Sequence, residues 1–300
     1  MRANPVLDVG GTHVTAALVY VTTWSSVPGS RHRRSLRSDG SADEIIDTLV
    51  DCASALGSLD GATLTVAMPG PFDYQAGIGR YEGVAKFDAL NGVDVRDRLL
   101  RALPEPPEAI EFLNDAGAFG IGEWISGATK GCRRSVGITL GTGVGSAFID
   151  QGVRVDSGPL VPPDGELHFV DVDGRPLEDV MSRRAIITAY CRYAGGDRSD
   201  DLDVRDIADR AANGDQAALR AIQEPCHALG TALAPWLVRF EAEGVVVGGG
   251  MTASWSLIEP PLRQGLASTT PALADLRVER SADPEESVEV GAAWFSAGAS

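Results

Sequence analysis

Two short turns rich in glycine and threonine hold the residues of this sequence that are best suited to chemistry. The first turn contains Gly10, Gly11 and Thr12, and the second contains Gly141, Thr142, Gly143 and Gly145. Glycines let backbone N–H groups approach an anion closely, and threonine hydroxyls add further donors. Each turn could therefore bind a phosphate group, although a single turn of this kind is more often only a tight hairpin.

Acidic and amide side chains accompany these turns. Asp8 precedes the first turn, and Asn114 and Asp115 come directly after the buried strand that we expect over residues 110–113. Open α/β sheets bind their ligands at the carboxyl ends of strands. Together these residues predict a cleft that grips one polyphosphate from both sides.

Composition narrows the classes of function. The 300 residues carry a formal net charge of −16, and the one basic cluster, residues 31–37, is short enough for a solvated loop or strand edge. Nucleic acids are bound by clustered Lys and Arg, so the charge argues against a nucleic-acid partner. The four cysteines match no metal-ligand spacing. No stretch has the length of a membrane span or the pattern of a secretory signal, so we expect a cytoplasmic protein with no membrane partner.

Apolar periodicity predicts strands that alternate with helices. We expect a hairpin over 5–21, a helix after the capping residue Ser41, strands at 63–68 and 110–113, helices at 95–103 and 116–124, a second hairpin over 136–149, helices within 177–240, a strand at 244–247 and a helix at 289–297. Because the hairpin motif occurs twice, the pattern predicts two related α/β domains that face a cleft. The expected domains are 1–113, joined by the C-terminal helix 287–300, and 114–286.

The order of these motifs resembles that of the ROK (repressor/open-reading-frame/kinase) sugar kinases, a family that includes bacterial glucokinases. The motifs are Asp8-Val9-Gly10-Gly11-Thr12, Met68-Pro69-Gly70, Asn114-Asp115-Ala116, Leu140-Gly141-Thr142-Gly143-Val144-Gly145 and Val247-Gly248-Gly249-Gly250. The resemblance spans nearly the whole chain. It implies a two-domain actin-like ATPase (ribonuclease H-like) fold with an interdomain cleft, and an ATP- and Mg²⁺-dependent kinase that phosphorylates the 6-hydroxyl of a hexose.

The resemblance also implies a role for each motif. Gly10, Gly11 and Thr12 would hold the terminal phosphates, Asp8 would bind Mg²⁺, and Gly141, Thr142, Gly143 and Gly145 would hold phosphates from the other domain. Gly248, Gly249 and Gly250 would lie against the adenosine. Asp115 would be the catalytic base, and its alternative role is the N-cap of the helix that follows.

Sugar-binding residues follow from the same resemblance. They are Asn114, together with Glu166, His168 and Glu178. The segment Gly165-Glu166-Leu167-His168 is one residue shorter than the Glu-x-Gly-His motif of the family. His168 has an alternative as a surface or loop histidine. Residues 171–175 replace a loop of zinc-binding cysteines and contain no cysteine, so we expect no zinc site.

A further departure concerns the sugar. Asp88 stands where the family's glucokinases have an asparagine that contacts the hydroxyls around position 3. A carboxylate only accepts hydrogen bonds and carries charge, which favours a 3-amino sugar such as kanosamine, as in kinases of antibiotic biosynthesis. The alternatives are that Asp88 accepts from the 3-hydroxyl of glucose, or that Asn91 is the true counterpart.

Other functions remain open at this stage. An ordinary glucokinase, a non-catalytic sugar sensor and a polyphosphate-dependent kinase all fit the motifs. A ROK repressor would need a helix-turn-helix module ahead of the first turn, for which seven residues before Asp8 give no room. The resemblance suggests a homodimer.

Overall fold

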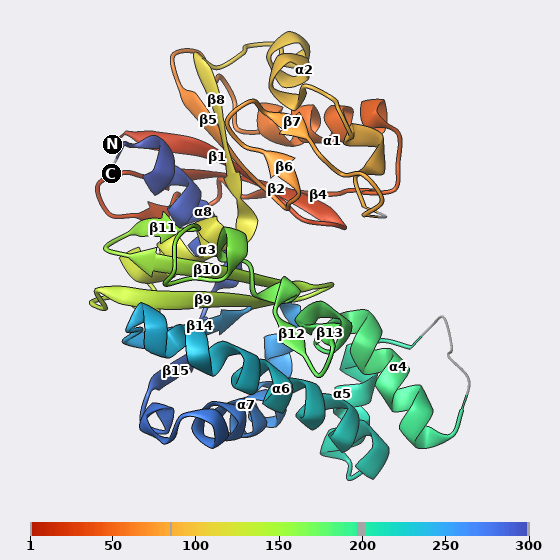
Figure 1. Ribbon diagram of the computed structural model, residues 1–300. Coiled ribbons are helices and arrows are strands. Elements are labelled where there is room, and N and C mark those ends of the chain that lie inside the picture. Colours follow the sequence, from red (N-terminus) through yellow and green to blue (C-terminus); the bar gives the residue numbers. More distant parts are fainter. Residues whose placement is uncertain (1, 85, 197–201, 299–300) are drawn as a thin grey trace. The chain divides into compact units, whose positions relative to one another are not determined.

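The computed structural model describes residues 2–84, 86–196 and 202–298, which form two compact units (Figure 1). The first unit comprises residues 1–127 and 283–300, and the second comprises residues 128–282. We expected the first boundary at residues 113 and 114, so the structure assigns one more helix to the first unit. Each unit is an α/β domain with its own sheet and its own core.

The first unit is built on a six-stranded sheet in the order β3-β2-β1-β5-β8, with β4 paired to β2. Its strands are β1 (Ala3–Val9), β2 (His13–Tyr20), β3 (Ser25–Ser26), β4 (His32–Ser35), β5 (Thr63–Met68) and β8 (Ala109–Asn114), and a separate small ladder joins β6 (Phe72–Asp73) to β7 (Ile78–Gly79). β1 and β2 form the expected antiparallel hairpin. β1, β5 and β8 are parallel to one another, so their carboxyl ends share one edge.

Four α-helices and a 3₁₀ turn accompany this sheet. They are α1 (Ala42–Ser54), α2 (Val95–Ala102), α3 (Asp115–Ile125), α8 (Pro284–Ser296) and η1 (Asp88–Leu90). The capping box of α1 is confirmed, because Ser41 accepts from the Glu44 N–H while the Glu44 carboxylate accepts from the Ser41 N–H. α8 begins five residues earlier than we expected, with Pro284 at a first-turn position that needs no N–H donor.

The basic cluster forms the exposed strand edge that the sequence predicts, and two of its arginines also make ion pairs within this unit. Arg31 and Arg33 flank His32 at the start of β4 and pair with acidic residues of α8. The Arg31 guanidinium contacts the fully buried Glu289 at 2.7 Å, and the Arg33 guanidinium contacts Glu285 at 2.5 Å. These arginines therefore help to hold the C-terminal helix against the first sheet.

The second unit repeats the arrangement with a five-stranded sheet in the order β11-β10-β9-β14-β15. Its strands are β9 (Arg134–Leu140), β10 (Val144–Asp150), β11 (Val153–Val155), β14 (Gly244–Gly248) and β15 (Arg277–Arg280), with a separate hairpin of β12 (Asp171–Val172) and β13 (Arg175–Pro176). β9 and β10 are antiparallel, while β9, β14 and β15 are parallel. Each unit thus begins with an antiparallel hairpin. The first strand of each hairpin also pairs, on its other side, with a parallel strand.

Helices of the second unit carry most of its core. They are α4 (Arg183–Ala194), α5 (Val204–Ala212), α6 (Gln216–Phe240) and α7 (Trp255–Thr269), with the 3₁₀ turns η2 (Pro163–Gly165), η3 (Leu167–Phe169), η4 (Leu177–Asp179), η5 (Gly250–Ser254) and η6 (Pro271–Leu273). α4 ends at Gly195, which adopts a left-handed conformation as its C-cap. None of the described helices is both long enough and apolar enough to cross a membrane.

Candidate active site

Strand register brings the acidic residues of the first unit together. Asp8 of β1 pairs with Ala67 of β5, and Ala67 pairs with Leu113 of β8, directly before Asn114 and Asp115. Because the three strands are parallel, Asp8, Asn114 and Asp115 all lie at the carboxyl edge of the sheet, where α/β proteins bind ligands.

The Asp8 carboxyl experiences an acidic, poorly solvated environment. Its burial, followed by the negative charge of Asp115, raises its pKa to about 8. Glu289 and Glu285 act in the same direction, and Arg33 acts against them. A carboxylate in this position gains from a cation beside it, because the cation offsets both the desolvation and the repulsion.

Asn114 is the N-cap of α3, a role that sequence analysis gave to Asp115 as its alternative. The Asn114 side-chain oxygen accepts from the Gly117 N–H at 2.9 Å. Asp115 instead occupies the first helical position, one residue before the expected start, and its Oδ1 accepts from the Ala116 N–H at 2.8 Å. The positive end of the helix dipole lies beside the Asp115 carboxyl and favours its charged form.

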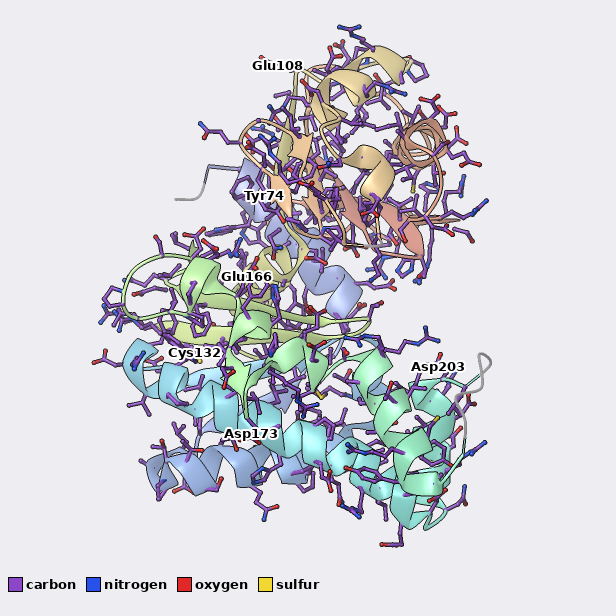
Figure 2. The ribbon with its side chains drawn as sticks, turned by 45° about the vertical axis from the view of Figure 1, so that its right-hand side comes forward. Tyr74, Glu108, Cys132, Glu166, Asp173 and Asp203 are labelled. Atoms are coloured by element: carbon purple, nitrogen blue, oxygen red, sulfur yellow. The ribbon has the colours of Figure 1, made fainter. Side chains whose placement is uncertain are left out.

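Two tyrosines that sequence analysis missed support this edge. The Asn114 amide donates to the Tyr74 hydroxyl at 3.1 Å, and that hydroxyl donates to the Met68 carbonyl at 3.1 Å. The Tyr81 hydroxyl donates to the Pro69 carbonyl at 2.6 Å. Figure 2 marks Tyr74, which follows β6 in the loop after the Met-Pro-Gly segment. Only the fold brings these tyrosines to the ends of β5 and β8.

The first Gly-Thr turn connects β1 to β2. The Gly10 N–H donates to the His13 carbonyl at 2.9 Å, and the Thr12 hydroxyl lies 3.1 Å from His13 Nδ1. Thr12 is exposed, while Gly10 and Gly11 are partly exposed. The turn thus presents its backbone and one hydroxyl to solvent at the same edge as Asp8.

Asp88 lies on the surface of the first unit. It is the first residue of η1, is exposed, and its Oδ1 accepts from the Val84 N–H at 3.2 Å. Asn91, the alternative sugar contact, is also exposed at the C-terminal end of the same turn. The structure therefore leaves both side chains accessible in one loop.

The second Gly-Thr turn connects β9 to β10 and has a carboxylate against it. The Gly141 N–H donates to the Gly143 carbonyl at 3.1 Å. A methyl group at Gly143 would lie 2.1 Å from Glu178 Oε1, so only glycine leaves room for this carboxylate. Thr142 is exposed at the tip of the turn, and Gly145 lies within β10 opposite Thr139.

The glycine triplet begins inside a strand. Gly248 is the last residue of β14 and pairs with Thr139 of β9, so the triplet lies beside the second turn. Gly249 has a φ of 91°, and a methyl group there would lie 2.3 Å from the Leu140 carbonyl oxygen. Gly250 is exposed, with no atom within 4 Å of the position that its Cβ would take. The triplet therefore offers bare backbone at the carboxyl edge of the second sheet.

Glu166 and His168 lie together in the second unit. Glu166 joins η2 to η3 (Figure 2), and its Oε2 is 3.4 Å from His168 Nε2. The buried Ser146 of β10, which sequence analysis missed, fixes this loop because its hydroxyl donates to the Gly165 carbonyl at 2.7 Å and accepts from the Leu167 N–H at 2.9 Å. One serine thus ties the proposed sugar loop to the second hairpin.

Residues 171–175 form a hairpin held by hydrogen bonds. β12 pairs with β13, and the Gly174 N–H donates to Asp171 Oδ1 at 3.1 Å. The Leu177 N–H donates to the Val170 carbonyl at 2.8 Å and closes the base of the hairpin. Among the described residues, no group of three or more His, Cys, Asp or Glu side chains is placed to hold a metal ion.

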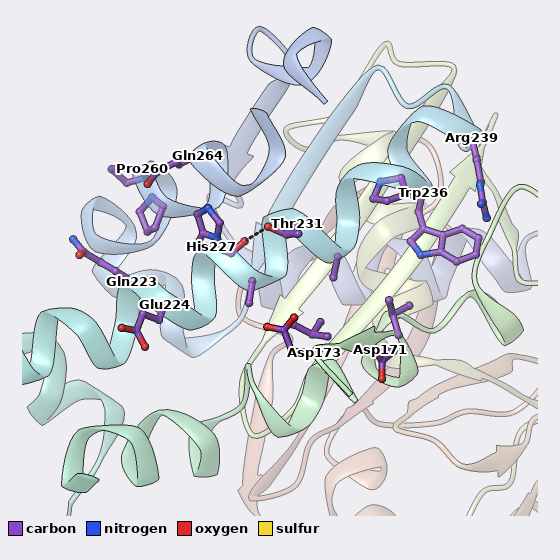
Figure 3. Close-up of a pocket in the computed structure, with 16 residues that line it drawn as sticks. Asp171, Asp173, Gln223, Glu224, His227, Thr231, Trp236, Arg239, Pro260 and Gln264 are labelled. Carbon is purple, nitrogen blue, oxygen red and sulfur yellow. Dashed lines mark hydrogen bonds between the residues drawn. The ribbon is translucent and has the colours of Figure 1, made fainter. Parts of the chain in front are cut away.

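A pocket of about 830 Å³ lies beside this hairpin, between β12, α6 and the middle of α7 (Figure 3). His227, Thr231 and Trp236 of α6 line it, together with Asp171 and Asp173. None of its lining residues is a predicted site residue. The pocket is therefore separate from the residues to which sequence analysis assigned chemistry.

The structure places the predicted site residues in two groups. The first unit holds Asp8, Gly10, Gly11, Thr12, Asp88, Asn114 and Asp115, and the second holds Gly141, Thr142, Gly143, Gly145, Glu166, His168, Glu178, Gly248, Gly249 and Gly250. In each unit the glycine-rich turn lies at the carboxyl edge of the sheet. The negatively charged groups of the first unit are suited to a cation, and the backbone of both turns is suited to anions.

The chain is similar in sequence to proteins of one family. The sequence profile of the ROK family matches residues 6–165 and 171–296. The chain is 27% identical over 282 residues to a glucokinase of Thermotoga maritima, which covers 86% of this chain and 85% of the relative. It is 26% identical over 276 residues to a kanosamine kinase of Amycolatopsis mediterranei, which covers 87% of this chain and 84% of the relative.

Solved structures identify the fold. A ROK family glucokinase from Streptomyces griseus, determined with glucose and AMPPNP, superposes with a TM-score of 0.76 at 21% identity over 98% of this chain and 99% of its own. A ROK hexokinase from Thermus thermophilus superposes with a TM-score of 0.73 at 21% identity over 100% of both chains. These neighbours have the actin-like ATPase fold that the motifs predicted. The chain therefore belongs to the ROK family.

Proposed function

We propose that this ROK sugar kinase transfers the γ-phosphate of ATP to the 6-hydroxyl of a glucose-like hexose. One observation carries the proposal. Asp115 lies at the N-terminus of α3, at the same sheet edge as Asp8 and the first Gly-Thr turn. This edge combines a candidate base, a candidate metal ligand and a candidate phosphate-binding turn, which are the parts that phosphoryl transfer requires.

The donor would be held by groups from both units. Gly10, Gly11 and Thr12 would bind the terminal phosphates, and Gly141, Thr142, Gly143 and Gly145 would bind phosphates from the second unit. Gly248, Gly249 and Gly250 would accommodate the adenosine. The support for these roles is the bare, partly exposed backbone at each sheet edge.

Asp8 fits a magnesium ligand because its carboxyl is poorly solvated and faces the negative charge of Asp115. Mg²⁺ is commonly held by one or two carboxylates together with substrate phosphates, so a cluster of several carboxylates is not required. When bound, the ion would neutralise charge on the phosphates.

The transfer step would use Asp115 as the base. The hexose 6-oxygen forms a bond to the γ-phosphorus, and the bond from that phosphorus to the β,γ-bridging oxygen breaks. The bond's electron pair stays on ADP, and the Asp115 carboxylate accepts the proton of the 6-hydroxyl. The dipole of α3, together with a cation held by Asp8, would support a charged Asp115.

The acceptor would be bound by Asn114, Glu166, His168 and Glu178. The Asn114 side-chain oxygen accepts from the Gly117 N–H at the N-terminus of α3. Its NH₂ group is therefore the part that could contact a sugar. Glu166 and His168 form an acceptor and donor pair 3.4 Å apart, which suits neighbouring hydroxyls.

Asp88 favours a 3-amino sugar such as kanosamine as the acceptor. Its carboxylate is exposed, and one oxygen already accepts from the Val84 N–H. The other oxygen could accept a charge-assisted hydrogen bond from an ammonium group. A kanosamine kinase is among the relatives, which supports the same acceptor. A glucokinase among them has the same percentage identity to this chain.

Turnover with a panel of acceptors tests the proposal. ATP and Mg²⁺ are supplied with glucose, 3-amino-3-deoxyglucose or 6-deoxyglucose, and the products are identified by phosphorus NMR. Phosphorylation of the first two sugars and none of 6-deoxyglucose is expected. Sugar binding without turnover would instead support a non-catalytic sugar sensor, and phosphate transfer from polyphosphate alone would replace ATP as the donor.

Asp88→Asn then tests the amino-sugar preference. Loss of one charge-assisted hydrogen bond should reduce kcat/KM for 3-amino-3-deoxyglucose by about tenfold or more, with a smaller change for glucose. A wild-type preference for glucose by an order of magnitude would rule the amino sugar out. Light scattering measures whether the protein is the homodimer that its family resemblance suggests.

A further inference from the structure

A lysine lies against the first Gly-Thr turn. A methyl group at Gly11 would be 3.3 Å from Lys86 Nζ, 3.5 Å from its Cε and 3.6 Å from its Cδ. The ammonium group and the end of its aliphatic stem therefore lie over the Gly11 α-carbon. A side chain at position 11 would crowd this cation, which would have to shift by a few tenths of an ångström.

The residue next to Lys86 is firmly anchored. Phe87 is 1% exposed, its N–H donates to the Ser38 carbonyl at 2.7 Å, and its ring packs 5.4 Å from the Tyr81 ring. Phe87 adopts a left-handed conformation with a φ of 57°, which turns the chain sharply after Lys86. The anchored Phe87 therefore fixes the backbone beside Lys86, whose side chain lies against Gly11.

The amino-acid usage of the chain makes this position unusual. Of its 26 basic residues, only Lys86 and Lys130 are lysines, and all the others are arginines. Lysine provides a compact, strongly hydrated point charge with three donors, whereas arginine provides a wide planar fork. A compact cation can approach a phosphate across a glycine backbone, as lysines do in other phosphate-binding loops.

The acidic groups around the first turn also favour a cation there. Asp8 and Asp115 place two carboxyl groups at this sheet edge, and Asp88 is two residues from Lys86 in the same loop. The terminal phosphate of a nucleotide would add further negative charge there. A fixed ammonium group at the turn would reduce this repulsion and stabilise charge on the group being transferred.

We propose that Lys86 contacts the terminal phosphate of the donor and stabilises the phosphoryl group during transfer. This inference rests on the proposed function, and it adds a charged residue to a site that is otherwise described by backbone and carboxylates. Lys86 lies over Gly11 of the candidate phosphate-binding turn and is two residues from the candidate sugar ligand Asp88, which is what assigns it to the terminal phosphate.

Lys86→Met is the direct test, because methionine keeps the aliphatic bulk and removes the charge. We expect kcat/KM for ATP to fall roughly 100-fold or more, since removal of one preorganised charged donor typically has an effect of this size. The affinity for AMPPNP with Mg²⁺, measured by calorimetry, should fall by about tenfold, while ADP and hexose affinities change less than about threefold. Lys86→Arg should restore part of the activity.

Lys130→Met is the matched control, because Lys130 is the other lysine of the chain and is exposed in the second unit. It should behave as the wild type does in every assay. Kinetic constants of Lys86→Met within about threefold of wild type would overturn the inference, as would an equal loss of ADP and AMPPNP affinity.

The two proposals can fail separately. If the wild-type protein phosphorylates no hexose, the proposed function fails, and the selective loss of AMPPNP affinity still decides the role of Lys86. If Lys86→Met does not fold, as judged by its thermal melting, Lys86→Gln replaces it in the same assays.

Discussion

The two Gly-Thr turns have similar sequences but very different surroundings. In the first unit, β1 and β2 pair up to Val9 and Val14, whereas in the second, β9 and β10 pair up to Leu140 and Val144, so the first turn is one residue longer. The strand position that Asp8 occupies in the first hairpin is filled by the neutral Thr139 in the second. One topology therefore places different side chains beside the two turns.

The two turns differ in the charged groups that lie near them. The first turn has the carboxyl groups of Asp8 and Asp115 nearby and the Lys86 ammonium group over Gly11. The second turn has bare backbone, an exposed threonine and the Glu178 carboxylate against Gly143. In the proposed function, the reacting groups would lie at the first turn, and the second turn would contribute backbone groups to donor binding.

The largest effect should come from the candidate base. Asp115→Asn keeps the shape of the side chain but removes its ability to accept a proton, so we expect kcat to fall by about 10³-fold while hexose affinity survives. Glu178→Gln beside the second turn should instead raise KM for the hexose with a smaller loss of kcat. Steady-state kinetics and calorimetry distinguish the two patterns. Near-native turnover in Asp115→Asn would exclude this residue as the base.

Asp8 and Thr139 give a matched pair of substitutions at equivalent strand positions. Asp8→Asn removes the candidate magnesium ligand, and we expect kcat/KM to fall by about 100-fold and the Mg²⁺ concentration for half-maximal rate to rise. Thr139→Val should change either quantity by less than about threefold. The comparison between the turns would be wrong if both substitutions had the same effect on the Mg²⁺ requirement.

Buried hydroxyl groups allow a stability test. Ser146 makes two hydrogen bonds that hold the Glu166 loop, so Ser146→Ala should reduce the free energy of unfolding by about 1–3 kcal/mol. In the first hairpin the Thr15 hydroxyl is buried with no hydrogen-bond partner among the described residues. Thr15→Val should therefore be neutral or stabilising. Denaturant melts measure both, and a larger loss in Thr15→Val would contradict the assignment.

The pH dependence of stability offers a test that is specific to Asp8. The pKa of Asp8 is near 3.8 in an unfolded chain and about 8 in the fold, so the folded protein holds the extra proton between these values. Stability from this group is complete below pH 4 and is lost as the pH rises toward 8. Without Mg²⁺, the melting temperature of Asp8→Asn should therefore rise relative to that of the wild type as the pH increases from 5 to about 8.5. A constant difference across this range would show that Asp8 has no raised pKa.

Local sequence was enough to predict many of the elements. The capping box at Ser41 placed α1 correctly, because its two hydrogen bonds depend only on residues three positions apart. The strands around both turns follow from apolar runs that end at glycine. Element ends were less accurate: α3 begins at Asp115 rather than after it, because Asn114 takes the capping role, and Gly248 extends β14 by pairing with Thr139.

Contacts between distant segments could not be predicted. The sequence predicts the exposed strand edge that contains Arg31 and Arg33, but it does not indicate that both pair with α8 from the far end of the chain. Tyr74, Ser146 and Lys86 carry no recognisable motif, since each acts on a segment that only folding brings near.

The sequence by itself determined the family, the two hairpins and the types of residue at their ends, because these depend on short-range order along the chain. Tertiary structure decided which charges surround each turn. Parallel pairing of β1, β5 and β8 places Asp8 beside Asp115, and the sharp bend at Phe87 places Lys86 on Gly11. Electrostatic interactions depend on distance in space, and the spacing of residues along the chain does not contain that distance.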